Sequence, residues 1–290
     1  MSEFFKSSRA RKIYGIAALS LTLLCTVLRM LSILFFFDKD IGYYQSGTAL
    51  PIIFEVLTVI SLLAATVFSL VKPVSISSNS ATNAPYVKYL ALLPAVGFAV
   101  FTVMYAKGIL GNLDTFRFTW QVALMLISSI GACAFFVLTA FTRSRANVVY
   151  VLTGSTAVIW LVSALAGSYF DSFVQMNSPN KIIFIFGALG GMLLVVNEMR
   201  RGLDEQKKGL HLLGATAASI LLTACALPSI ICFFAGAMPW NYSSLYYDIA
   251  YLSLAVFSVA RLVQLCFCNK AVPLDENTSE IAADENQEQI

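Results

Sequence analysis

Charged side chains are scarce in this chain of 290 residues, because only 12% are Asp, Glu, Lys or Arg while 58% are hydrophobic. Soluble globular domains carry about 25% charged and about 45–50% apolar residues. A chain with so little charge cannot cover its apolar residues with a water-facing surface, so the sequence predicts a protein that crosses a lipid bilayer repeatedly. The net charge of +3 is also too small for a nucleic-acid-binding surface, which excludes nucleic acid as a partner.

Histidine is almost absent, since His211 is the only one. The sequence also lacks the H-E-x-x-H pattern of zinc proteases, the G-x-S-x-G turn of serine hydrolases and a phosphate-binding glycine loop. Catalysis requires a nucleophile with a base, or a metal with its ligands. We therefore expect a protein that is not an enzyme and that holds no metal and no cofactor.

Long apolar runs are what the chain does contain. A bilayer core of about 30 Å requires about 20 apolar residues as helix, and such a segment must pair its own backbone polar groups. The expected fold class is all-α, a polytopic bundle of eight transmembrane helices in the plasma membrane. The predicted spans are 13–37, 49–71, 87–107, 118–141, 148–170, 181–199, 211–237 and 245–267.

The distribution of Lys and Arg among the loops predicts which ends of these spans face the cytoplasm. With the basic segment 1–12 in the cytoplasm, thirteen Lys and Arg fall in inner loops and four in outer loops, as the positive-inside rule requires. Both termini are then predicted to be cytoplasmic. The segment 268–290 contains six acidic residues and one Lys, without apolar periodicity, which is typical of a solvated, disordered tail.

Short matches recur at a nearly constant offset along the chain. Phe36-Phe37-Asp38 resembles Tyr169-Phe170-Asp171 at an offset of 133, and Leu93-Pro94 matches Leu227-Pro228 at an offset of 134. An even number of spans in each copy makes the repeat parallel, with its axis along the membrane normal. We therefore predict a 4+4 internal repeat with the halves 13–141 and 148–267.

Two opposite charges lie at matched depth in the first predicted hairpin. A helix rises 1.5 Å per residue, which places Arg29 and Glu55 roughly 10–13 Å below the outer ends of their helices. Charges inside a span face protein or water, so we predict an Arg29–Glu55 ion pair. It would either fix the register of the hairpin or serve as a gating or binding group. Near the inner side, Arg261 is expected to extend to the interface, where Glu198 could pair with it.

Proline interrupts two predicted spans at corresponding places. Pro94 and Pro228 each remove a backbone hydrogen bond and kink a helix, and Gly97 adds slack one turn after Pro94. Interrupted helices at matching places in two halves point to a transport path. Proline is, however, common in membrane helices in general, so a simple kink is the alternative.

Aromatic and polar residues gather on the predicted outer face. An interfacial aromatic belt accounts for Tyr and Trp, whereas aromatic walls with a few acids and amides suit a vestibule for a small ligand. The predicted vestibule consists of Asp38, Tyr43, Tyr44, Trp120, Gln121, Asp171, Trp240, Tyr247 and Asp248.

Two functions from different classes fit this pattern. The first is a small-molecule transporter or permease-like bundle, for which a solvated cavity reaching Arg29 or Glu55 is expected. The alternative is a non-transporting membrane component, such as a sensor, an assembly partner or an accessory subunit. Its protein partner would bind the cytoplasmic loop 200–210 or the acidic tail.

Overall fold

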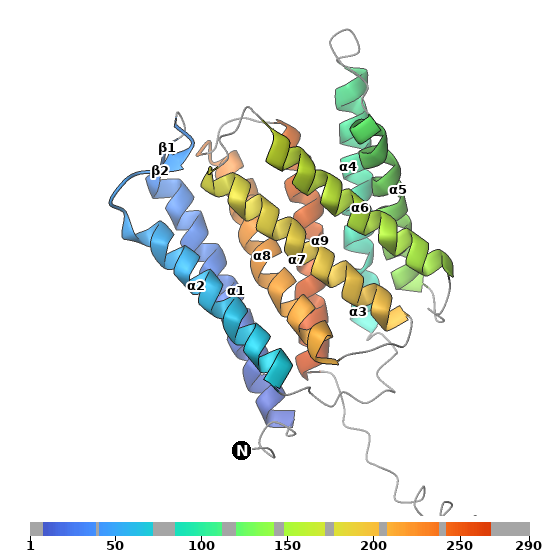
Figure 1. Ribbon diagram of the computed structural model, residues 1–290, viewed down its shortest axis with the longest axis horizontal. Coiled ribbons are helices and arrows are strands. Elements are labelled where there is room, and N and C mark those ends of the chain that lie inside the picture. Colours follow the sequence, from blue (N-terminus) through green and yellow to red (C-terminus); the bar gives the residue numbers. More distant parts are fainter. Residues whose placement is uncertain are drawn as a thin grey trace, which may run out of the picture.

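The computed structural model describes residues 8–38, 41–71, 85–111, 120–141, 148–171, 177–202, 208–237 and 242–267. These ranges form helices and one short antiparallel hairpin (Figure 1). In chain order the elements are α1 (Ser8–Phe36), β1 (Phe37–Asp38), β2 (Tyr43–Tyr44), α2 (Ala49–Val71), α3 (Pro85–Leu90), α4 (Leu92–Leu110), α5 (Trp120–Phe141), α6 (Val148–Phe170), α7 (Pro179–Gly202), α8 (Lys208–Phe234) and α9 (Tyr242–Phe267).

Eight helical segments among the described residues are long and apolar enough to cross a membrane, which makes the chain a multi-pass membrane protein. They lie within a few residues of the predicted spans, and α3 and α4 together make up the third, Tyr86–Leu110. The prediction of eight spans is confirmed. The basic segment 1–7, the joint 142–147, the loop 203–207 and the tail 268–290 lie outside the described residues.

The helices α8 and α9 form the centre of the bundle (Figure 1). In their membrane-spanning windows 67% and 72% of residues are buried, against 28–44% in the other spans. The hairpin of α1 and α2 packs on one side of this central pair. Helices α4, α5 and α6 lie on the other side, and α7 bridges α6 and α8.

The first four spans do not pack together as one unit. Helices α1 and α2 are separated from α4 and α5 by the central pair (Figure 1). Moreover, α1 packs closely along α8, whereas α6 and α4, the positions that a 4+4 repeat makes equivalent, meet only through large side chains such as Trp160 and Phe98. The contacts between the halves therefore do not follow a twofold axis, and the duplication stays a prediction from sequence matches.

Small residues allow α7 to approach α8 closely. Gly187 and Gly190 of α7 face Cys225 and Leu221 of α8, and a Cβ at either glycine would lie 3.2 Å from the Cβ of its neighbour. Membrane helices lack a hydrophobic drive toward each other, so such close van der Waals packing replaces it. The α7–α8 contact therefore depends on these glycines.

The third span is interrupted shortly before Pro94, and Gly97 makes a close contact with α9. The helix is interrupted at Ala91, and Pro94 lies in the first turn of α4, where its missing N–H is tolerated. Gly97 is a contact residue, because a Cβ there would lie 2.8 Å from the Cβ of Ser253 in α9 and would meet the Ser253 hydroxyl. Gly97 thus allows α4 to approach α9 closely, and the kink predicted at Pro94 and Gly97 stays a prediction.

Substitution of Gly97 by Ala should lower thermal stability, because overpacking a close contact costs about 1–3 kcal/mol. The matched control is Gly108→Ala on the same helix, where an added Cβ has no neighbour within 4 Å. Thermal unfolding of the purified protein should show a clear loss for Gly97→Ala, partial recovery with Ser253→Gly, and little change for Gly108→Ala. Equal midpoints for the two alanine variants would contradict the close contact.

Candidate functional site

A buried arginine joins α1 to the middle of the bundle. Arg29 is 1% exposed. Its Nη1 donates to the backbone carbonyls of Ala224 and, at 2.6 Å, of Cys225 in α8. Its Nη2 lies 3.3 Å from Asn180 Oδ1 of α7 and 3.4 Å from Ser229 Oγ of α8. The guanidinium therefore links three helices through uncharged partners.

Pro228 explains why a carbonyl of α8 is free to accept this guanidinium. In an α-helix the amide of residue 228 would donate to the carbonyl of Ala224, but proline has no N–H. Arg29 supplies the missing donor. The neighbouring carbonyl of Cys225 also accepts a hydrogen bond of 2.7 Å from the Ser229 hydroxyl. Arg29 and Pro228, which the sequence presents as separate features, thus take part in one contact.

The predicted Arg29–Glu55 ion pair is wrong. Arg29 and Glu55 are both described, yet the guanidinium contacts α7 and α8 while Glu55 is exposed. The buried face of α2 repeats every three or four residues, through Phe54, Thr58 and Ser61. Glu55 lies about 100° away from Phe54 around the helix, on the side of the exposed apolar residues that face lipid.

Asp248 of α9 is a buried acidic residue near Arg29. It is 8% exposed and interacts electrostatically with Arg29, but no direct ion pair joins these two described residues. Tyr251, one turn further along α9, interacts with Asp248 as well. The Tyr251 hydroxyl and the Arg29 Nε are buried, and neither has a hydrogen-bond partner among the described residues. We call Arg29, Asn180, Ser229, Asp248 and Tyr251 the outer cluster, after the side of the membrane that the sequence predicts for it.

The β1–β2 hairpin lies over this cluster. Asp38 pairs with Tyr43 in the hairpin, and the Ser178 hydroxyl of the segment before α7 donates to the Gly42 carbonyl at 3.3 Å. Burial raises the pKa of the Tyr44 phenol, and the positive charge of nearby Arg29 opposes that rise. Tyr44 therefore lies beside the guanidinium, which is closed to solvent in this conformation. The open cavity expected at Arg29 or Glu55 is not formed at Arg29.

The remaining vestibule residues do not gather around Arg29. Trp120 is 77% exposed at the start of α5, as an aromatic belt residue is, and Gln121 lies beside Gly167 of α6. The Asp171 carbonyl accepts a hydrogen bond of 2.9 Å from Lys181 at the start of α7. Trp240 lies outside the described residues. No contact among the described residues places Trp120, Gln121 or Asp171 at Arg29, and the vestibule as a whole stays a prediction.

Tyr247 belongs to an aromatic cluster between α4, α6 and α9. Buried Trp160 is at its centre, with ring centroids of Phe98, Phe101 and Tyr247 at 4.8, 4.9 and 5.8 Å. The two phenylalanine rings meet Trp160 edge to face, and such pairs add about 0.5–1.5 kcal/mol each to simple burial. This cluster forms part of the main hydrophobic core, so Tyr247 is a packing residue beside the outer cluster.

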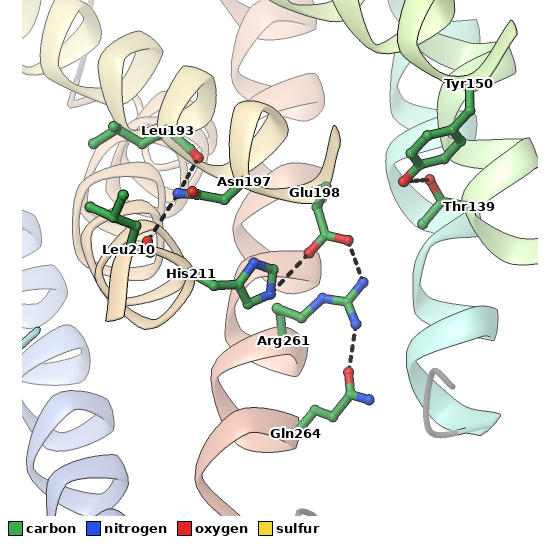
Figure 2. Close-up of polar contacts among 9 residues, drawn as sticks. All are labelled: Thr139, Tyr150, Leu193, Asn197, Glu198, Leu210, His211, Arg261 and Gln264. Carbon is green, nitrogen blue, oxygen red and sulfur yellow. Dashed lines mark hydrogen bonds and ion pairs between the residues drawn. The ribbon is translucent and has the colours of Figure 1, made fainter. Parts of the chain in front are cut away.

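A second polar cluster lies near the other end of α7, α8 and α9 (Figure 2). Arg261 is fully buried, and its Nη2 donates to Glu198 Oε2 at 2.6 Å. Its Nη1 donates to Gln264 Oε1 at 2.5 Å, and His211 Nε2 lies 3.6 Å from Glu198 Oε1. We call Glu198, His211, Arg261 and Gln264 the inner cluster.

Arg261 therefore does not extend to the interface as expected. Its side chain turns inward because Glu198, Gln264 and the face of the Phe257 ring, 5.2 Å from the guanidinium carbon, provide partners inside the protein. Asn197 fixes the helix end that carries Glu198, since its Nδ2 donates to the carbonyls of Leu193 and Leu210 at 2.8 and 3.0 Å (Figure 2).

Comparisons with family models, with curated proteins and with solved structures give no match for this chain.

The contact between Arg29 and the proline-freed carbonyl is tested by a double-mutant cycle. Replacing Pro228 by Ala restores an amide donor for the Ala224 carbonyl, so the Arg29→Gln substitution should destabilise the Pro228→Ala protein less than the unaltered protein. We expect a coupling of about 1 kcal/mol, measured by thermal unfolding. Strictly additive effects would show that Arg29 does not replace the missing amide.

The ion pair of the inner cluster is tested by neutralising one of its two charges at a time. Glu198→Gln and Arg261→Gln should each be strongly destabilising, because removal of one partner from a buried ion pair costs about 3–5 kcal/mol. The double variant Glu198→Leu with Arg261→Met should be more stable than either single variant, since it leaves no buried charge unpaired. Arg200→Gln, at an exposed position of α7, is the control. Mild, independent effects would contradict a buried pair.

Proposed function

We propose that the chain is a small-molecule transporter of the plasma membrane and not an enzyme, with its substrate path along α7, α8 and α9 between the outer and inner clusters. The observation that carries this proposal is the placement of both clusters on the same three helices. Asn180 and Glu198 belong to α7, Ser229 and His211 to α8, and Asp248 and Arg261 to α9. Two of these helices are the most buried in the bundle.

Stability alone does not account for charges in this position. A charged residue at the centre of a membrane helix is unfavourable by about 2.5–3.5 kcal/mol on insertion scales. Apolar residues of similar volume often replace a buried ion pair without loss of stability. Charges kept at two depths of the central helices are therefore better explained by a function that needs polar groups along a path through the bundle.

The structure fits a conformation in which this path is closed. Arg29 and Arg261 are 1% and 0% exposed. A transporter opens such clusters to one side of the membrane at a time. The gap in the hydrogen bonding of α8 at Pro228 supplies a place where the helix can bend, because the Ala224 carbonyl there is held by a side chain of α1 and not by its own helix. Movement of α1 away from α8 releases that carbonyl.

The proposal is tested by thiol labelling from each side of the membrane. One variant carries Ser229→Cys as its only cysteine, with every native cysteine replaced by Ala. The matched control carries Ala132→Cys as its only cysteine, because Ala132 is fully buried on α5, which packs on α4 and α6. An impermeant thiol reagent is then applied to right-side-out and to inside-out vesicles.

A transporter should expose Ser229→Cys to the reagent from both sides and much faster than Ala132→Cys. Labelling of Ser229→Cys from one side only would identify a ligand-binding site without passage. Labelling of Ser229→Cys as slow as that of Ala132→Cys from both sides would show a closed structural bundle. Either of the last two results would contradict transport.

A further inference from the structure

We propose that the inner cluster is a proton-binding site, in which His211 takes up a proton and Glu198 is then shared between His211 and Arg261. The proton would be the coupling ion of the transporter, and this part of the inference rests on the proposed function. Uptake of the proton itself follows from the arrangement of the three side chains and is measured separately.

The three side chains of the proposed site come from three helices and meet at one carboxylate, as Figure 2 shows. Glu198 belongs to α7, His211 to the first turn of α8 and Arg261 to α9. The Oε2 atom of Glu198 accepts a hydrogen bond of 2.6 Å from Arg261, and its Oε1 atom faces Nε2 of His211. Because each oxygen of a carboxylate accepts hydrogen bonds, one Glu198 side chain can hold two cationic partners at once.

The distance between His211 and Glu198 fits a ring that has not yet taken up the proton. An N–H···O hydrogen bond is about 2.7–3.2 Å long, whereas His211 Nε2 and Glu198 Oε1 are 3.6 Å apart. A neutral imidazole carries one N–H, on either nitrogen, and the imidazolium carries both. Protonation therefore ensures a donor at Nε2 and adds a charge attraction, so the two atoms should approach to hydrogen-bond distance.

His211 is the member of the site that water reaches most easily. Its side chain is 10% exposed, whereas the side chains of Glu198 and Arg261 are 0% exposed. It lies at the end of its span, close to the start of α8, and it is the only histidine in the chain. Histidine is the side chain that ordinarily changes its charge between about pH 5 and 8. A proton can therefore pass between water and this ring while the ion pair behind it stays buried.

The other titratable groups around this end of α8 do not compete with His211 in that range. Helix α8 packs against α1, α2, α7 and α9. The only acid of α2, Glu55, lies near the opposite end of that helix. Glu, Cys, Tyr, Lys and Arg side chains ordinarily titrate below about pH 5 or above about pH 8. The described groups at this end are Arg9, Arg11, Lys12 and Tyr14 on α1, Glu198 and Arg200 on α7, and Arg261 and Cys266 on α9.

Protonation changes the net charge of a buried cluster. Glu198 and Arg261 together are neutral, so a proton on His211 leaves one net positive charge among buried side chains. A buried net charge is unfavourable, and contact with water stabilises it. The protonated site should therefore favour a conformation in which this end of α7, α8 and α9 opens to water. The proposed transport cycle requires such an opening on this side.

The first experiment follows the protonation of His211 by NMR in the full-length chain, purified without a histidine tag and held in lipid nanodiscs. Because His211 is the only histidine, ¹⁵N labelling of histidine gives a single pair of ring-nitrogen signals. We expect these signals to change from the neutral to the imidazolium pattern between about pH 8 and pH 5. A ring that keeps one protonation state over this range would overturn the inference, and this result does not depend on any variant.

The second experiment measures whether the proton moves the helices. Spin labels are placed at Ile13→Cys on α1 and Arg200→Cys on α7, both exposed positions at this end of the bundle, with the native cysteines replaced. The population with the longer distance should increase about twofold or more from pH 8 to pH 5. His211→Gln, which stays neutral, should keep the short distance at both pH values. His211→Arg, which stays charged, should favour the long distance at both.

A merely structural histidine would not move the distance in opposite directions in these two variants. A pH response of the same size in His211→Gln and in the chain with native His211 would assign the response to another group and overturn the inference. A titrating ring with no change of distance at any pH would overturn the coupling role.

The labelling of Ser229→Cys separates this inference from the proposed function. Labelling from one side only, together with a titrating ring and a distance that responds to pH, would contradict transport and support the proton-binding site. Labelling from both sides, together with a ring that keeps one protonation state, would support transport and overturn the proton-binding site.

Discussion

The hydrogen bonds between the Arg29 guanidinium and the carbonyls of Ala224 and Cys225 hold together the end of the bundle that carries the β1–β2 hairpin. Pro228 leaves one of these carbonyls without its helical donor, and a backbone polar group without a partner is costly in a membrane. Arg29 satisfies it, and the same contact places a positive charge beside α7 and near Asp248 of α9. One interaction therefore joins the α1–α2 hairpin to the central helices and creates the outer cluster.

The eight spans could be predicted from the sequence because the length of an apolar run and the thickness of the bilayer determine them. The neighbours of each span could not. Helices α8 and α9 fill the centre, and they separate the α1–α2 hairpin from α4 and α5. No apolar run encodes that arrangement. It depends on close contacts such as Gly97 with Ser253, which involve residues far apart in the chain.

The depth of the candidate site residues in the membrane could be predicted from the sequence, but their partners could not. Counting residues placed Arg29 and Glu55 at one depth, but the direction in which each points depends on rotation about the helix axis. The buried face of α2 passes through Phe54 and Thr58 and leaves Glu55 outside. Arg29, Pro228, Asp248, Glu198 and Arg261 were singled out by their charge or backbone chemistry, whereas Asn180, Ser229 and Tyr251 carry no such signal. The position of Ser229 directly after Pro228 was the one available indication.

The central claim is that α1 and α8 separate at their outer ends and break the contact with Arg29. The most direct test is a spin-label distance between Phe35→Cys on α1 and Phe234→Cys on α8, both exposed positions, measured in nanodiscs with the native cysteines replaced. The account predicts two distances, a short one for the closed structure and a longer one for an open state. A single distance that matches the closed structure, with and without ligand, would contradict it.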